Sequence, residues 1–171
     1  MEEILIVDGY NIIGSWPRLR ELKEKGNLEG ARDELLDWLS EYQAFKGRKV
    51  IVVFDAHQVS GQGKKYKDRR LTVHFTKENE TADEFIEKLV GDLNHRKRMV
   101  YVATSDYTEQ RVIFGRGALR ISARELFNEQ EMVKDNILET VKHKNQSLKQ
   151  NLFSVIDSET IKFFENLRRK K

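Results

Sequence analysis

Three short apolar runs, separated by patterns typical of amphipathic helices, constrain the fold of this chain more than any other feature. The runs cover residues 4–7, 50–54 and 99–103. Uninterrupted apolar residues are typical of parallel strands that are buried on both faces. Strands that alternate with helices favour a parallel sheet with helices on both faces. We therefore predict a three-layer α/β fold in which helices flank a mainly parallel central sheet.

Hydrophobic periodicity predicts the remaining elements. Apolar residues at steps of three or four predict a helix over 28–46, which Gly47 ends, and another over 82–95. Thr81 and Glu84 form a capping-box pattern before the second of these helices. The other predictions are short strands at 71–75 and 118–121, helices at 106–114 and from Ser122, a loop over 57–70, a linker over 145–151 and a final short helix after Asp157. The segment 14–26 is predicted to be a loop with a short helical piece around Leu19 and Leu22.

Length and composition limit the class of protein. The 171 residues suit one main domain with one sizeable core. The absence of cysteine excludes disulfides and thiolate metal sites. No apolar segment approaches the roughly 20 residues of a membrane span, and a strand begins near residue 4, where a signal peptide would need its basic and apolar regions. We expect a cytoplasmic protein with no membrane partner.

Basic residues gather in short stretches, although the net charge is only +3. Basic clusters are typical of proteins that contact phosphate backbones, but basic loops and tails are also common on ordinary surfaces. We predict nucleic-acid contact from this pattern. The largest cluster comprises Lys64, Lys65, Lys67, Arg69 and Arg70, and two more lie at residues 96–98 and 168–171.

Aspartates follow all three apolar runs. Asp8 ends the first run, Asp55 the second, and Asp106 comes shortly after the third. Because the carboxyl ends of parallel strands meet at one edge, where α/β folds bind their ligands, we expect an acidic cluster there. Each aspartate also has a purely structural alternative. Asp8 with Gly9 is a common turn pattern, and Asp55 could anchor the loop that follows it. Asp106 is a good helix cap, and Ser105 could equally fill that role.

The residues around Asp8 leave two further alternatives open. Asn11 is either a helix N-cap or a polar ligand beside Asp8. Tyr10 either stacks on a nucleic-acid base or packs under the turn.

A second group of acids opens the predicted helix at 82–95. Acids are favoured in a first helical turn, which accounts for part of this pattern. Four like charges at one helix end are nevertheless costly unless a cation lies near them. The group consists of Glu80, Asp83, Glu84 and Glu87.

A hard divalent cation is the simplest way to hold several carboxylates ionised at one sheet edge. Mg²⁺ or Mn²⁺ prefers carboxylate and water oxygens and leaves positions for a substrate phosphate. Such an ion activates water and stabilises charge on a phosphodiester. Together with the basic stretches, this pattern predicts metal-dependent phosphodiester hydrolysis, and we expect no small-molecule organic cofactor.

Several of these segments together resemble the NYN-domain ribonucleases, and specifically their YacP-like bacterial branch. The resemblance covers about residues 3–127. It rests on Val7–Asn11, Val53–His57, Phe75–Asp83 and Ala103–Gln110, with further matches at Gly117–Arg120 and Ser122–Leu126.

The resemblance implies a PIN-like, Rossmann-like fold and an endoribonuclease that uses Mg²⁺ or Mn²⁺. It implies that Asp8, Asp83 and Asp106 are the catalytic metal ligands, with Asn11 beside them. Other NYN branches carry a further acid one helical turn later, where this chain has Gln110. The branch is associated with messenger RNA cleavage on ribosomes, which implies RNA as substrate and the ribosome as partner. Supporting acids would be Asp55, Glu80, Glu84 and Glu109, and RNA or ribosome contacts would involve Lys64, Lys65, Lys67, Arg69, Arg70, Lys77 and Arg120.

Two other hypotheses remain beside the endoribonuclease. One is a non-catalytic RNA- or ribosome-binding module with a vestigial acidic site. The other is a phosphatase or phosphoacceptor, which is disfavoured because Asp8 is followed by Gly-Tyr-Asn and not by a second Asp two residues on. We predict a nuclease domain at 1–127 and a helical extension at 128–171, either packed on that domain or trailing from it.

Overall fold

A computed structural model describes residues 2–55, 71–94, 97–105, 115, 117–155, 160, 162, 165 and 168. The chain divides into two compact units, Met1–Val133 and Lys134–Lys171. The predicted division after residue 127 stays a prediction. No helix in the described ranges is long and apolar enough to cross a membrane.

The first unit contains a five-stranded sheet in which every pairing is parallel. The strand order is β3-β2-β1-β4-β5, so β1 lies at the centre and the predicted strand at 71–75 lies at an edge. All carboxyl ends therefore lie along one edge of the sheet, and Asp8 pairs with Val53 at this edge. The strands are β1 (Glu2–Asp8), β2 (Lys49–Phe54), β3 (Thr72–Phe75), β4 (Arg98–Ala103) and β5 (Leu119–Ile121).

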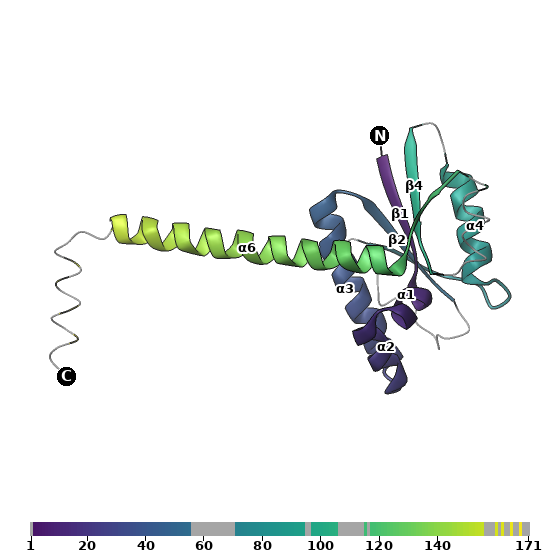
Figure 1. Cartoon of the computed structure of the whole chain (residues 1–171), viewed down its shortest axis with the longest axis horizontal. Coiled ribbons are helices and arrows are strands. Elements are labelled where there is room, and N and C mark those ends of the chain that lie inside the picture. Colours follow the sequence, from purple (N-terminus) through teal and green to yellow (C-terminus); the bar gives the residue numbers. More distant parts are fainter. Residues whose placement is uncertain are drawn as a thin grey trace. The chain divides into compact units, whose positions relative to one another are not determined.

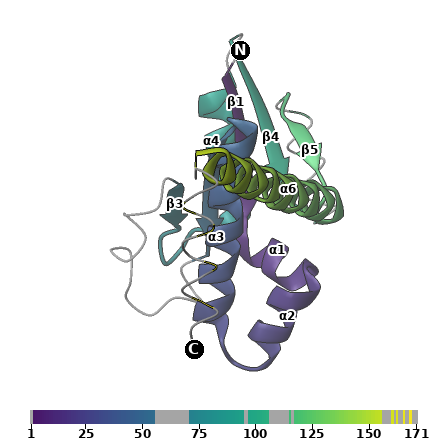
Figure 2. The ribbon, with the colours of Figure 1, turned by 90° about the vertical axis from the view of Figure 1, so that its left-hand side faces the viewer.

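Helices cover both faces of the sheet, as the sequence predicts. Helix α4 lies on one face, and α1, α2 and α3 lie on the other (Figures 1 and 2). Helix α6 runs on from β5, and its first part belongs to the first unit. The helices are α1 (Gly9–Ser15), α2 (Pro17–Glu24), α3 (Leu28–Lys46), α4 (Ala82–Leu93) and α6 (Ala123–Val155).

The core explains why the strands are apolar without interruption. Ile4 and Ile6 of β1 pack with Ile86 and Val90 of α4. The intervening Leu5 is also fully buried, because successive strand residues point to opposite faces and both faces are covered.

Most predicted strands and helices in the described ranges are confirmed in type, although several termini differ by one or two residues. Helix α3 begins and ends where the periodicity places it, and Gly47 ends it with a left-handed φ of 69°. Thr81 and Glu84 form the predicted capping box. Ser122 and Glu125 exchange the same pair of hydrogen bonds at the start of α6. The loop at 57–70 and the helix at 106–114 lie outside the described residues.

Two predictions about irregular segments need correction. The short helical piece predicted at Leu19 and Leu22 is confirmed within α2, but most of the rest of 14–26 is helical too, because Asp8 caps α1 and Pro17 stands at the start of α2, where its missing N–H costs nothing. The linker at 145–151 is instead part of α6, since that stretch is polar but contains neither Gly nor Pro to stop a helix. The final helix after Asp157 lies largely outside the described residues.

Candidate functional site

Asp8 is the last residue of the central strand and also the N-cap of the next helix. Its Oδ1 atom accepts a hydrogen bond from the backbone N–H of Asn11 at 3.1 Å. The side chain lies at the carboxyl edge of the sheet, and only 7% of the residue is exposed. The predicted turn-forming role is therefore real, and it places a poorly hydrated carboxylate at the edge where α/β folds bind ligands.

Gly9 and Tyr10 fix the chain beneath this carboxylate. A Cβ atom on Gly9 would lie 2.2 Å from Cε1 of Phe54, so only glycine fits against that ring. Tyr10 packs on the same ring with centroids 5.1 Å apart, and its hydroxyl accepts a hydrogen bond from the buried Arg32 at 3.0 Å. Tyr10 thus packs under the turn, which decides between the two alternatives for this residue.

Asn11 connects the ends of two neighbouring strands. It lies inside α1, and its Oδ1 atom accepts a hydrogen bond from the backbone N–H of Ser105 at 2.8 Å. Ser105 follows β4 closely, and the Thr104 before it is fully buried. Asn11 is therefore not the helix cap; its backbone contacts Asp8 and its side chain holds the segment that leads to Asp106. Asp106 itself lies outside the described residues.

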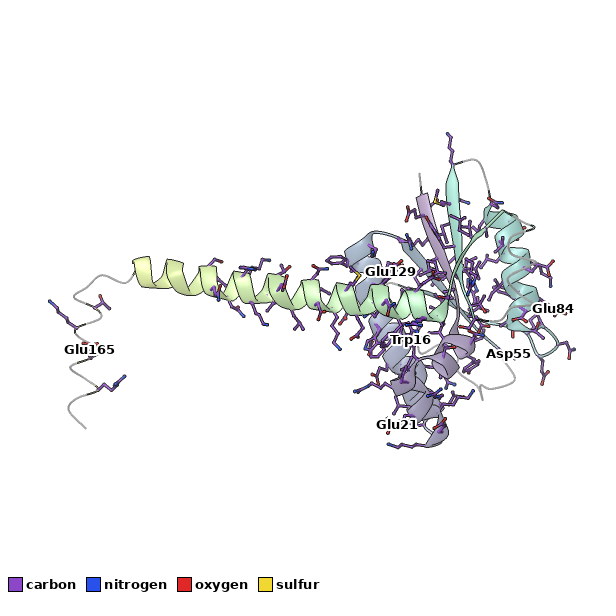
Figure 3. All side chains as sticks on the ribbon, in the orientation of Figure 1. Trp16, Glu21, Asp55, Glu84, Glu129 and Glu165 are labelled. Carbon is purple, nitrogen blue, oxygen red and sulfur yellow. The ribbon has the colours of Figure 1, made fainter. Side chains whose placement is uncertain are left out.

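Asp83 occupies the first turn of α4, which residues 76–81 place at the same edge of the sheet. Its side chain is exposed. The neighbouring Glu84 completes the capping box with Thr81, through two hydrogen bonds of 3.2 Å. Glu84 in this turn and the half-buried Asp55 after β2 lie at the same end of the sheet (Figure 3).

The acids beside Asp83 have partners within the chain. Lys88 donates a 2.7 Å hydrogen bond to Glu80, and this bond lowers the pKa of the Glu80 carboxyl below its usual value. The acids of this helix end therefore need a metal ion less than the sequence suggests, because Lys88 already pairs with Glu80 and Glu84 serves as part of a cap. Both contacts give these two acids a structural role.

Comparison with known proteins decides the family. The model of the YacP-like NYN domain matches residues 5–169. This chain belongs to the YacP-like NYN family. It is 52% identical over 167 residues to the uncharacterized protein YacP of Bacillus subtilis (strain 168), an alignment that covers 98% of this chain and 97% of that protein.

Solved structures of the same relative share the fold. The crystal structure of Rae1 (YacP) from Bacillus subtilis matches with a TM-score of 0.78 and 51% identity, over 97% of this chain and 94% of the other. The crystal structure of a mutant of that protein matches with a TM-score of 0.73 and 52% identity, over 83% and 82% of the two chains. NYN domains are nucleases, so the family also implies a nucleic-acid substrate.

NYN and PIN-like nucleases generally use divalent metal ions, and the donor atoms at this edge suit such an ion. Asp8, Asp55 and Asp83 offer carboxylate oxygens, which Mg²⁺ and Mn²⁺ prefer. Among the described residues, no three acids or histidines lie close enough together to hold a metal.

The structure brings together only part of the predicted site. Asp8 and Asn11 are linked directly, and the first turn of α4 carries Asp83 at the same edge. Sequence reasoning missed Ser105, whose backbone N–H binds Asn11; its position just after the third apolar run was the available signal. Lys77 and Arg120 are exposed, and their contact with RNA or the ribosome stays a prediction. The predicted residues outside the described ranges are Asp106, Glu109, Lys64, Lys65, Lys67, Arg69 and Arg70.

Proposed function

We propose that this protein is a metal-dependent endoribonuclease that hydrolyses phosphodiester bonds of messenger RNA in association with the ribosome. The observation that carries the proposal is the contact of Asn11 with both strand ends. Its backbone binds Asp8, and its side chain binds the segment just before Asp106. Membership of a nuclease family and the basic stretches support RNA as the substrate. The resemblance to the YacP-like branch supports the ribosome as partner.

In this proposal Asp8, Asp83 and Asp106 hold one or more Mg²⁺ or Mn²⁺ ions. The ion supplies an activated water and stabilises negative charge on the phosphodiester. Asp8 is suited to this task because its carboxylate is poorly hydrated, which makes a nearby cation favourable. Asn11 acts on the site by fixing the distance between the ends of β1 and β4.

Cleavage of RNA by carboxylate variants tests the proposal. Wild type, Asp8→Asn and Asp83→Asn are incubated with messenger RNA and Mg²⁺ or Mn²⁺, with and without ribosomes. We expect each variant to cleave about 100-fold more slowly or worse, since each loses a charge that stabilises the transition state. Asp33→Asn on α3 is the matched control and should cleave as wild type does. Equal cleavage by all four proteins contradicts the catalytic assignment.

The same experiment separates the non-catalytic alternative. A vestigial site predicts that no version cleaves RNA under any condition while wild type and variants still bind ribosomes or RNA. Release of phosphate from small phosphomonoesters would instead favour the phosphatase hypothesis.

The basic cluster at 64–70 is proposed as an RNA- or ribosome-binding surface, together with Lys77 and Arg120. Replacing Lys64, Lys65 and Lys67 with Ala should weaken binding and reduce the slope of log affinity against log salt by roughly 2, because each phosphate contact on a single strand contributes about 0.7. Replacing Arg20 and Lys23 of α2 and Lys25 just after it with Ala is the charge-matched control. An unchanged slope in the first variant removes this cluster from the binding surface.

A further inference from the structure

A pocket lies directly beside the candidate site. Its volume is about 440 Å³, within the range of small-ligand pockets. Its wall includes Ser15 and Trp16 at the end of α1, Ser105 after β4, and Arg124 and Phe127 in the first turns of α6. All of these residues belong to the first unit.

The floor of the pocket is aromatic, and its polar atoms are already used. The Nε1 atom of Trp16 donates a 2.8 Å hydrogen bond to the carbonyl of Ala123, and Trp16 is only 1% exposed, so the indole supports the floor and presents almost no surface of its own. Phe127 meets Trp16 edge-on with ring centroids 5.5 Å apart, and Phe127 is only half-buried. The floor therefore suits a flat, apolar group that stacks on Phe127.

The rim of the pocket is polar and carries one positive charge. The hydroxyls of Ser15 and Ser105 lie 3.5 Å apart on one side. Asn128 and the exposed Arg124 lie on α6. This arrangement offers hydrogen-bond donors and acceptors to the edge of a flat ring, and a cation to a nearby phosphate.

Ser105 is shared between this pocket and the candidate site. Its side chain lines the pocket, while its backbone N–H binds Asn11. Asn11 in turn contacts Asp8. A nucleotide whose phosphate reached Asp8 would therefore have a neighbouring base close to the pocket.

We infer that this pocket is a base-binding subsite, which receives one unpaired nucleobase of the RNA next to the cleaved phosphodiester. A base has apolar faces and polar edges, as the floor and rim require, and aromatic stacking of bases is common in single-strand recognition. Arg124 binds the phosphate of the same or the adjoining nucleotide. The inference rests on the proposed function, because it takes RNA as the substrate of the adjacent site.

Binding of short RNAs that each lack one base tests the inference without requiring cleavage. A set of single-stranded oligoribonucleotides, each with one abasic position, is titrated in EDTA against the full-length wild type and Phe127→Leu, with fluorescence anisotropy as the readout. Wild type should show one position at which loss of the base weakens binding about tenfold. Phe127→Leu should bind the intact RNA about tenfold more weakly and lose sensitivity to that position.

Matched variants distinguish a specific effect on the pocket from a general effect of misfolding. Phe45 is exposed near the C-terminus of α3 and does not line the pocket, so Phe45→Leu should bind RNA as wild type does. Asn128→Ala on the rim should alter which base is preferred at the sensitive position, and Asn145→Ala farther along α6 should not. Melting temperatures establish that each protein is folded.

The outcomes separate the subsite from the proposed function. The subsite is overturned if Phe127→Leu and Asn128→Ala both respond to the missing base as wild type does. It is also overturned if the wild-type protein binds no RNA at all. A change of oligomeric state in Phe127→Leu without any change in abasic sensitivity also overturns it, and assigns the pocket to protein contact. If the protein cleaves no RNA but Phe127→Leu removes the sensitivity to one abasic position, the subsite is supported and only the proposed catalysis is contradicted.

Discussion

Asn11 is the single residue on which the geometry of the candidate site depends most. Replacing it with Ala leaves the N–H of Ser105 without its acceptor and frees the segment before Asp106. Because small misplacements of reacting groups are costly, we expect the RNA cleavage rate of Asn11→Ala to fall by up to about 100-fold. Loss of one hydrogen bond should lower the free energy of unfolding by only about 1 kcal/mol.

A matched asparagine separates the effect on activity from the effect on stability. Asn27 caps α3 through a 2.9 Å hydrogen bond from Gly30. Asn27→Ala should cost a similar ~1 kcal/mol in urea unfolding and leave cleavage unchanged. If the two variants lose the same fraction of activity, the loss at Asn11 reflects general destabilisation and the positioning role is wrong.

Gly9 and Gly14 in α1 provide a second contrast at the scale of single residues. A methyl group on Gly9 meets the ring of Phe54, which is fully buried between Tyr10 and Phe75. Gly9→Ala should therefore lower the free energy of unfolding by about 1–3 kcal/mol. Around Gly14 no atom of the described residues lies within 4 Å of the added carbon, apart from its chain neighbours and the backbone of its own helix, and Gly14→Ala should stabilise the helix by roughly 0.5–1 kcal/mol. Urea titrations give both values, and equal effects would contradict the packing of this turn.

At the scale of elements, one network joins α3, β1 and α6 through hydrogen bonds and β4 through a cation–π contact. The Tyr42 hydroxyl donates to Glu129 at 2.7 Å and accepts from Arg48 at 2.9 Å. Arg48 also binds Glu3 at 2.8 Å and lies over the ring of Tyr101, 4.2 Å from its centroid. The network therefore fastens the first part of α6 to the sheet through α3.

This network predicts a loss of stability at high pH. Burial, and to a lesser extent the hydrogen bond to Glu129, raises the pKa of Tyr42 far above its ordinary value. The folded protein then holds this proton more tightly than the unfolded chain does. The contribution of this proton to the free energy of unfolding is fully present below about pH 10, the pKa of tyrosine in the unfolded chain. It is lost progressively as the pH rises above that value. Urea unfolding between pH 8 and 11 should show this decline in wild type and a smaller one in Tyr42→Phe; equal slopes contradict the prediction.

Sequence patterns predicted those elements in which periodicity and capping agree. The apolar runs of β1, β2 and β4 and the stripes of α3 and α4 each had one consistent interpretation. Helix α1 was missed because Asp8 ends a strand and caps a helix at once, leaving no intervening loop residues to mark the change. The position of Ser105 just after the third apolar run indicated only that it lies at this edge. Its bond to Asn11 was not predictable, since it joins residues far apart in the sequence through a backbone atom.

At the scale of the whole molecule, the parallel sheet gathers the functional groups along one edge. Asp8, Asp55 and the first turn of α4 all lie there because every strand runs in the same direction. The YacP-like NYN family model extends to residue 169, so the helical segment after Val133 belongs to the family pattern together with the sheet. The central claim is that a metal ion at this edge contacts the phosphodiester that is cleaved.

Sulfur substitution at the cleaved phosphate tests this claim most directly. Mg²⁺ binds oxygen far better than sulfur, whereas Mn²⁺ accepts sulfur more readily. An RNA with one nonbridging phosphate oxygen replaced by sulfur should be cleaved at least about tenfold more slowly than the normal RNA in Mg²⁺, and this gap should close in Mn²⁺ for one of the two stereoisomers. The same slowing in both metals for both stereoisomers would contradict direct contact between the metal and the phosphate.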